Sequence, residues 1–241
     1  MPGTQELITA VIEEKITLHE KWKDAIATFN VDCQNGFSPN CPGELPVAGA
    51  TEIVEELNKQ AEYAGVHVAS KDAHCLAAVY NATPNEPQFT GLDGYPDADI
   101  KWNTHCIMGT YGAELLEGLP PVKDYDYFVW KGIEPTMHPY GACYHDTAQE
   151  MSTGVIEFLN GADVDTVIVG GLATDYCVKT TVLQLVRGGF GVILNLGACR
   201  GIAPDTIEVA KKEMDEAGVY LINSSNDIQT ARDAYKGRIN A

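Results

Sequence analysis

The chain alternates short apolar runs with longer stretches in which apolar residues recur at helical spacing. The short runs are apolar on both faces, which is typical of strands buried in a parallel sheet. Six runs are predicted as strands, at residues 25–31, 66–70, 127–129, 166–170, 191–196 and 219–222. Because strands and helices alternate, we expect the α/β class, with a doubly wound, Rossmann-like sheet of six parallel strands and helices on both faces.

Two segments between the strands have the pattern of amphipathic helices. Residues 51–64 place Ile53, Leu57 and Ala61 on one face, and residues 204–217 form the second segment. A glycine follows each segment directly, as is common where a helix ends. Since ligands bind beyond the carboxyl ends of parallel strands, polar residues at those ends are the candidates for a functional site.

Two other segments lie outside the alternating pattern. Residues 4–22 have apolar residues at helical spacing, so we expect an N-terminal helical extension over 1–22 that packs on the body or on another subunit. Residues 76–103 are rich in Asn, Pro, Gly and Asp and have no periodicity, which predicts a long active-site loop. No linker divides the chain, and we expect one domain over residues 1–241.

The composition changes the range of possible partners. Its 45% hydrophobic and 21% charged residues are typical of a folded globular chain and exclude disorder. The net charge of -18 would repel nucleic acids and anionic membrane surfaces, so we expect neither as a partner. No apolar stretch reaches the ~18 residues of a membrane helix, and the first residues lack the regions of a signal peptide, so we expect a cytoplasmic protein.

Seven cysteines are spread singly along the chain, without the pairs of zinc ribbons or disulfide scaffolds, and we expect them to be reduced. Most should be small buried apolar residues. Cys177 differs, because Thr174 is a suitable N-cap that would make Cys177 the third residue of a helix. The positive helix end and a nearby lysine would then lower the thiol pKa; a buried structural cysteine is the alternative.

Polar side chains also mark the ends of two other strands. Asp32 ends the first strand and Lys131 closely follows the third, and parallel strands bring these ends to one edge of the sheet. Taken alone, Asp32 would cap a turn and Lys131 would extend to solvent. Together with Cys177, they favour an acid/base group beside a nucleophile.

A set of metal ligands follows the second strand. Asp72 and His74 stand two residues apart, and His105 offers a third ligand. One carboxylate and two imidazoles suit Zn²⁺, Fe²⁺ or Mn²⁺, so we expect one divalent metal ion, with zinc as the first choice. The spacing alone is also compatible with two surface histidines and an aspartate that caps a turn.

Four stretches are specific enough to compare with known families. They are Asp32-Cys33-Gln34-Asn35-Gly36-Phe37, Lys71-Asp72-Ala73-His74, Trp102-Asn103-Thr104-His105-Cys106-Ile107-Met108-Gly109-Thr110-Tyr111-Gly112-Ala113-Glu114-Leu115 and Gly170-Gly171-Leu172-Ala173-Thr174-Asp175-Tyr176-Cys177-Val178. In this order, with Lys131-Gly132 between the last two, they resemble the nicotinamidase/pyrazinamidase branch of the isochorismatase-like cysteine hydrolases, over roughly residues 25–222. Each stretch alone is only a weak indication of the family, but the four stretches in this order are a specific one.

The resemblance implies that Asp32, Lys131 and Cys177 form a catalytic triad. Asp32 would take the thiol proton and Lys131 would stabilise the adjacent anions, while the Cys177 thiolate attacks a carboxamide carbon and forms a thioester. The backbone N–H groups of Ala173 and Cys177 would form the oxyanion hole. Family members also carry a cis peptide bond that corresponds to Leu172–Ala173.

The resemblance further implies that Asp72, His74 and His105 hold the metal, which would bind the ring nitrogen of a pyridine substrate. Phe37 and Trp102 would sandwich that ring, and plain packing is the alternative role for both. The implied reaction is hydrolysis of nicotinamide to nicotinate and ammonia in NAD salvage, with pyrazinamide as an analogue. The resemblance also implies a homo-oligomer.

The sequence departs from the family pattern in two places. No further histidine ligand is evident before His105; Glu86 or Asp93 could contribute, but three ligands completed by water are simpler. Gly197 stands where the family commonly has an aspartate. Two alternatives to a nicotinamidase are open: another cysteine amidohydrolase acting on ureido or carbamoyl amides, and a non-catalytic scaffold.

Overall fold

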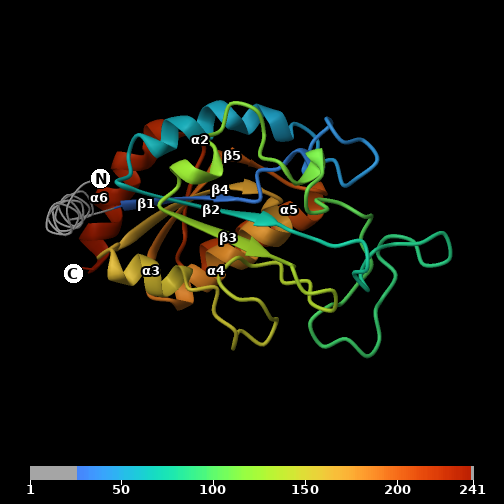
Figure 1. Cartoon of the computed structure of the whole chain (residues 1–241). Helices are drawn as coiled ribbons and strands as arrows, with labels where there is room; N and C mark the ends of the chain where they lie inside the picture. Colours follow the sequence, from blue (N-terminus) through green and yellow to red (C-terminus); the bar gives the residue numbers. More distant parts are fainter. Residues whose placement is uncertain (1–25, 240–241) are drawn as a thin grey trace, which may run out of the picture.

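The computed structural model describes residues 26–239 and contains one six-stranded parallel sheet (Figure 1). Its strands are β1 (Ile26–Val31), β2 (Val66–Asp72), β3 (Tyr127–Lys131), β4 (Thr166–Leu172), β5 (Gly191–Arg200) and β6 (Tyr220–Ile222). They lie in the order β3-β2-β1-β4-β5-β6. The predicted fold class and the six strands are confirmed, and the predicted N-terminal helix lies outside the described residues.

Several strands continue beyond their predicted ends. β2 reaches Asp72 and β3 reaches Lys131, and these two residues are partners in the register of the sheet. The prediction ended both strands before these charged residues, because an isolated charge is costly to bury. Here the two opposite charges lie in contact, so both residues remain within their strands.

Helices cover both faces of the sheet (Figure 1). α3 (Val155–Gly161), α4 (Lys179–Arg187) and α5 (Pro204–Glu216) pack on one face, and α2 (Val54–Ala61) and α6 (Ile228–Ile239) pack on the other. The sequence pattern did not predict α3, which is only about two turns long, or α6. No helix in the described part of the chain is long and apolar enough to cross a membrane.

The helix predicted over residues 51–64 is shorter than expected. A 3₁₀ turn, Ala50–Ile53, precedes α2, and α2 ends at Ala61, before the glycine that the prediction used as its end. The predicted apolar face is nevertheless the one that contacts the sheet, because Ile53 and Leu57 are fully buried.

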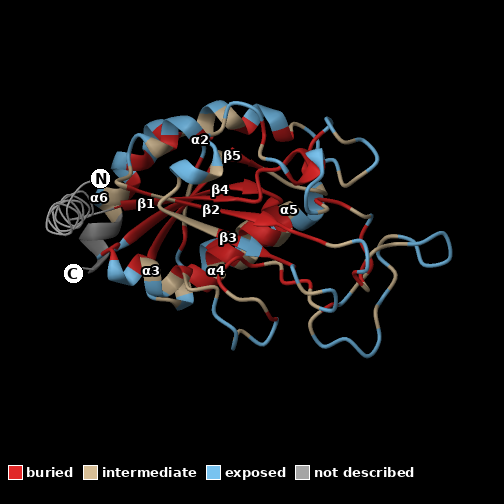
Figure 2. Ribbon diagram, in the orientation of Figure 1, coloured by how far each residue is buried: buried red, intermediate tan, exposed pale blue. Residues whose placement is uncertain are grey.

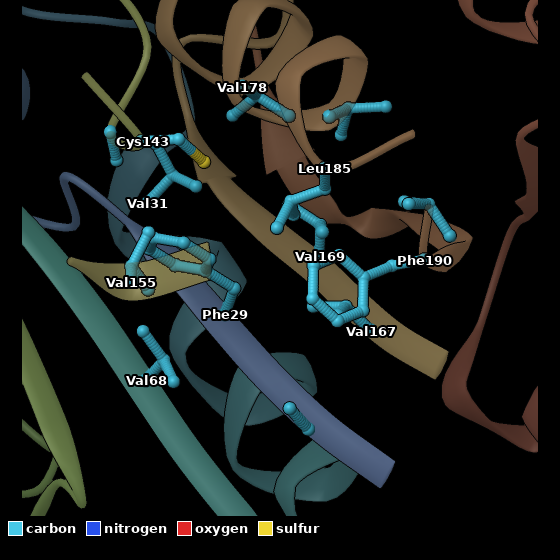
Figure 3. Close-up of a cluster of buried hydrophobic side chains, with 14 of the residues drawn as sticks. Phe29, Val31, Val68, Cys143, Val155, Val167, Val169, Val178, Leu185 and Phe190 are labelled. Atoms are coloured by element: carbon cyan, nitrogen blue, oxygen red, sulfur yellow. The ribbon is translucent and has the colours of Figure 1, made fainter. Parts of the chain in front are cut away.

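The larger apolar core lies between the sheet and helices α3, α4 and α5 (Figure 3). β1 contributes Phe29, β4 contributes Val167 and Val169, and Leu185 of α4 packs against them. Each large apolar side chain buried in this way contributes about 1.5–3 kcal/mol. Buried residues concentrate in the strands and on the inner sides of the helices, while the outer helix faces and much of the loops are exposed (Figure 2).

The neighbouring strands β1 and β4 mark the point where the chain changes face. The connection after β1 leads to α2 on one face, and the connection after β4 leads to α4 on the other. Gly171 allows the two strands to approach closely, because its φ is +137° and a Cβ atom there would lie 2.1 Å from the carbonyl oxygen of Val31. Doubly wound sheets bind ligands at such a point.

The turn after β4 differs from the prediction. Residues Thr174–Val178 form a π-helical turn, and α4 begins only at Lys179. Ala173, rather than Thr174, precedes the turn, and its carbonyl oxygen accepts the N–H groups of Tyr176 and Val178. π-helical turns are frequent at functional sites. The Leu172–Ala173 peptide bond is cis, as predicted.

Candidate active site

Three polar side chains meet at the carboxyl ends of β1, β3 and β4. Lys131 Nζ lies 3.0 Å from Asp32 Oδ2 and 3.6 Å from Cys177 Sγ. Asp32 and Lys131 are fully buried, and Cys177 retains 7% exposure at the wall of a pocket. The structure therefore brings together Asp32, Lys131 and Cys177, the residues that the sequence grouped as a triad; we refer to them as the thiol cluster.

Asp32 is held by β2. Ser70 Oγ donates a hydrogen bond to Asp32 Oδ1 at 2.7 Å, and the backbone N–H of Asp32 donates to the carbonyl oxygen of Ser70 at 3.2 Å. Asp32 has φ of +48°, a left-handed conformation that aspartate tolerates better than most residues. Sequence reasoning missed Ser70, although a serine within an otherwise apolar strand is an indication of a polar contact.

Burial determines the protonation of the thiol cluster. It raises the pKa of Asp32 from 3.8 to about 6, although Lys131 opposes this shift. Burial also raises the pKa of the Cys177 thiol well above its ordinary value, and Lys131 only partly counters it. Burial would lower the pKa of Lys131, but Asp32 and Asp72 raise it well above its ordinary value. The expected thiolate is therefore wrong for the resting site: a protonated thiol lies beside a carboxylate that can accept its proton.

Asp72 links the thiol cluster to two histidines. One carboxylate oxygen, Oδ1, contacts Lys131 Nζ, while Oδ2 lies 3.5 Å from His74 Nε2 and 3.8 Å from His105 Nε2. Burial would raise the pKa of Asp72, but Lys131 and His74 hold it well below its ordinary value. The predicted ligand residues therefore lie together around an ionised carboxylate. Gln34, which the prediction did not assign, holds Asp72 through two 2.8 Å hydrogen bonds to its backbone.

Hydrogen bonds at Nδ1 orient both histidine rings. His74 Nδ1 lies 3.1 Å from the carbonyl oxygen of Gly132 and 2.7 Å from the hydroxyl of Tyr80. His105 Nδ1 lies 2.6 Å from the carbonyl oxygen of Asn103. His74 Nε2 is buried without a hydrogen-bond partner, and metal-binding histidines commonly donate their other N–H group to a carbonyl in this way. These donors fit a divalent cation such as zinc, iron or manganese.

A third histidine, His138, joins this group and was not predicted. One ligand atom from each of His74, His105 and His138 lies within 4.8 Å of the others. Burial lowers the pKa of His138 well below its ordinary value, so its ring is neutral. The residue lies in an irregular segment after β3, where no periodicity or spacing in the sequence indicates a ligand. We refer to these three residues as the histidine cluster.

The acidic residues considered as further ligands lie elsewhere. The exposed Glu86 forms an ion pair with the buried Lys101 at 3.1 Å, and Asp93 is exposed. Neither lines the pocket beside the histidine cluster. Their proximity to His105 in the sequence therefore does not bring them to the candidate metal site.

Cys177 of the thiol cluster lines the same pocket as Asp72, His105 and His138, and the empty space of this pocket is about 310 Å³, including its open mouth. Phe37 and Trp102, the predicted ring contacts, both line it, and the rings of Phe37 and His105 lie 5.1 Å apart. Tyr140 and Tyr176 also form its wall and were not predicted.

Part of the long loop at residues 76–103 forms this wall. Trp102 Nε1 donates to the hydroxyl of Tyr140 at 3.2 Å, and that hydroxyl donates to Asp99 at 2.8 Å. Lys101 donates to the carbonyl oxygen of Val79 at 2.6 Å. The loop thus contributes the side chain of Trp102 to the pocket wall, and these hydrogen bonds hold it in place.

Comparison with known proteins identifies the family to which the chain belongs. The isochorismatase domain family matches residues 27–226, and the chain belongs to this family. The nicotinamidase of Escherichia coli (strain K12) is 32% identical over 206 residues, which cover 81% of this chain and 93% of the relative. The resemblance to the nicotinamidase/pyrazinamidase branch is therefore confirmed.

Solved structures of the same branch share the fold. The structure of the Acinetobacter baumanii nicotinamidase/pyrazinamidase has a TM-score of 0.77 at 31% identity and covers 85% of this chain and 98% of its own. The pyrazinamidase of Pyrococcus horikoshii in complex with zinc has a TM-score of 0.65 at 28% identity and covers 82% and 98%.

Proposed function

We propose that the protein is a metal-dependent nicotinamidase that hydrolyses nicotinamide to nicotinate and ammonia, with pyrazinamide as an analogue and a role in NAD salvage. The main support is the thiol of Cys177, 3.6 Å from Lys131 Nζ, in the same small pocket as a buried set of metal ligands. Relatives that match most of this chain carry the name nicotinamidase.

Substrate binding in this proposal uses the whole pocket. Phe37 and Trp102 contact the two faces of the pyridine ring. Asp72, His74 and His105 would hold a divalent cation, which would supply a Lewis-acid contact for the ring nitrogen. The ring is then held at the histidine cluster, and its carboxamide extends toward the thiol cluster.

The first half of the proposed reaction forms a thioester. Asp32 takes the proton of Cys177 Sγ, and the sulfur attacks the carboxamide carbon. The carbonyl oxygen gains the negative charge and accepts the backbone N–H groups of Ala173 and Cys177, while Lys131 offsets the charge of the neighbouring carboxylate. The C–N bond then breaks, Asp32 returns its proton to the departing nitrogen, and ammonia leaves.

The second half releases the acid. Asp32 takes a proton from water as the water oxygen attacks the thioester carbon, the C–S bond breaks, and Cys177 recovers its proton from Asp32. Nicotinate leaves, and the site returns to its resting state. Asp32 exchanges a proton in both halves, and its pKa of about 6 suits a group that must both accept and donate near neutral pH.

Ammonia release tests this proposal directly. The purified protein is incubated with nicotinamide and, in separate samples, Zn²⁺, Fe²⁺ or Mn²⁺, beside Cys177→Ala and a control variant, Cys41→Ala, whose cysteine lies outside the pocket. We expect wild type and Cys41→Ala to release ammonia and Cys177→Ala to stay at background. Equal release from wild type and Cys177→Ala would refute the proposal.

A substrate panel separates the alternatives. A cysteine amidohydrolase for ureido or carbamoyl amides needs the thiol cluster but no cation to hold a pyridine ring. We expect nicotinamide to be preferred, and His74→Ala to lose that activity while it stays folded. Faster turnover of a ureido amide that is insensitive to His74→Ala would favour the other amidohydrolase, and no turnover of any amide would favour a scaffold.

A further inference from the structure

We propose that His138 is a protein ligand of the same cation as Asp72, His74 and His105. The inference rests on the proposed function in one respect, namely that a divalent cation occupies this site. It goes beyond the ligand set expected from the sequence, because it adds a third imidazole from a different part of the chain.

The side chain of His138 lacks the partners that a buried imidazole requires. It is 3% exposed, and neither Nδ1 nor Nε2 has a hydrogen-bond partner. A buried polar atom without a partner costs about 1–3 kcal/mol. Two such atoms on one ring are therefore costly unless a group outside the protein chain binds one of them.

The nearby hydroxyl groups are already used by other residues. The Tyr80 hydroxyl donates to the carbonyl oxygen of Gly132 at 3.0 Å and lies 2.7 Å from His74 Nδ1. The Tyr140 hydroxyl donates to Asp99 and accepts from Trp102. Both tyrosine rings contact the ring of His138, with centroids 4.5 Å and 5.2 Å away, so the histidine is surrounded by groups that leave its nitrogens unpaired.

The position of the ring matches a shared cation. One ring nitrogen of His138 lies within 4.8 Å of ligand atoms of both His74 and His105. Nitrogens bound to one zinc ion at ~2.0–2.1 Å lie no more than about 4.2 Å apart. Because 4.8 Å slightly exceeds this limit, the rings would have to move closer together when a cation binds. His138 lines the same pocket as Asp72 and His105, so its ring is at the place where the cation would bind.

The backbone holds His138 in this place from both sides. Its N–H donates to the carbonyl oxygen of Asp97 in the long loop at 2.6 Å. The carbonyl oxygen of the next residue, Pro139, accepts a hydrogen bond from Lys131 Nζ at 3.4 Å. The segment that carries the histidine is thus fastened to the wall of the pocket and to the thiol cluster.

A fourth protein ligand changes what the site can bind. Catalytic zinc sites usually have three protein ligands and one open position, and zinc can expand to five ligands. With His138 bound, a substrate nitrogen enters as a fifth ligand. The site should hold its metal more tightly than a three-ligand site, because each ligand adds to the affinity.

Metal affinity and spectroscopy test the assignment. Wild type, His138→Ala and a matched control, His145→Ala, whose histidine lies outside the metal group, are titrated with Zn²⁺ against a chromophoric chelator. Each is also loaded with Co²⁺ for its visible spectrum. Removal of outer-shell partners of metal ligands costs 10–100-fold in affinity, so we expect His138→Ala to lose at least as much, with a changed Co²⁺ spectrum, and His145→Ala to match wild type.

The opposite result would overturn the assignment. If His138→Ala binds Zn²⁺ within twofold of wild type and gives the same Co²⁺ spectrum, His138 is only a wall of the pocket. If the variant does not fold, X-ray absorption of the zinc-loaded wild type counts the imidazoles instead: three support the assignment and two refute it.

This experiment is independent of the proposed reaction. A wild type that binds zinc through three imidazoles but releases no ammonia from nicotinamide would refute the proposed function and support the assignment of His138 as a metal ligand. A wild type that releases ammonia and binds zinc through two imidazoles would support the proposed function and refute the assignment of His138 as a metal ligand.

Discussion

The two halves of the pocket are built from different parts of the fold. Asp32 and Lys131 of the thiol cluster stand at the ends of β1 and β3, and Cys177 lies in the turn directly after β4. The histidine cluster comes from irregular segments: His74 and His105 lie in the connection between β2 and β3, and His138 lies in the connection after β3. Hydrogen bonds to carbonyl and hydroxyl oxygens orient the rings of His74 and His105. The strands therefore position the thiol cluster, while local contacts position the histidine cluster, so variants should affect the two halves separately.

The largest effect is expected when Cys177, the proposed nucleophile, is removed. Cys177→Ala should lower ammonia release from nicotinamide by at least about 10⁴-fold, because removal of the nucleophile of a catalytic triad abolishes nearly all turnover. Its Zn²⁺ affinity should stay within twofold of wild type, since the histidine cluster is intact. Ammonia assays and chelator competition measure the two quantities. Activity above 1% of wild type would show that another group attacks the substrate.

Removal of a metal ligand should have the next largest effect. His105→Ala should lower kcat/KM for nicotinamide about 100-fold, because the pyridine ring of the substrate would no longer be held with its carboxamide beside the Cys177 thiol. Alkylation of Cys177 by iodoacetamide without substrate should proceed at the wild-type rate. His145→Ala serves as the control for both measurements. A slower alkylation of His105→Ala would contradict the independence of the two halves.

Loss of the hydroxyl that orients His74 should have a smaller effect. Tyr80→Phe removes the contact to His74 Nδ1 and should weaken Zn²⁺ binding about tenfold. At saturating Zn²⁺, kcat should return close to the wild-type value. Tyr111→Phe is the matched control, since Tyr111 is 61% exposed and lies outside the pocket. Unchanged affinity in Tyr80→Phe would show that Gly132 alone orients the ring.

The pH dependence tests the thiol cluster alone. Asp32 accepts the thiol proton only when it is ionised, and burial raises its pKa to about 6. kcat/KM should therefore fall as the pH decreases through about 6, by roughly tenfold for each further unit. Initial rates from pH 4.5 to 8, with the bound metal measured at each pH, check this. A decrease that begins only near pH 4, with metal still bound, would indicate an ordinary aspartate.

The sequence predicted the thiol cluster better than the histidine cluster for a physical reason. Parallel strands end at one edge of the sheet, so the order of strands along the chain already implied that Asp32, Lys131 and Cys177 converge. The path of an irregular loop depends on tertiary contacts instead, and no periodicity pointed to His138. The thiol pKa was predicted in the wrong direction, because the extent of burial at Cys177 also depends on the complete fold.

The secondary structure shows the same contrast between regular strands, which were predicted, and the connections between them, which were predicted less well. All six strands were predicted, because each is a distinct apolar run, while α3 and α6 were missed. The start of the helix after β4 was predicted wrongly. Thr174 is a suitable capping residue, but Ala173 is the residue that precedes the turn in the structure. Local residue preferences therefore identified the elements but not how the chain turns between them.

Asp72 has a practical consequence for anyone who dissects this site by mutation. Its two oxygens serve different neighbours, Lys131 on one side and the imidazoles on the other. If the proposed function holds, a substitution there should disturb proton transfer and metal retention at once, so an inactive Asp72 variant would identify neither role. The roles of individual residues must therefore be assigned with variants of residues that contact only the thiol cluster or only the histidine cluster. A variant of Asp72 shows instead how strongly the two clusters depend on each other.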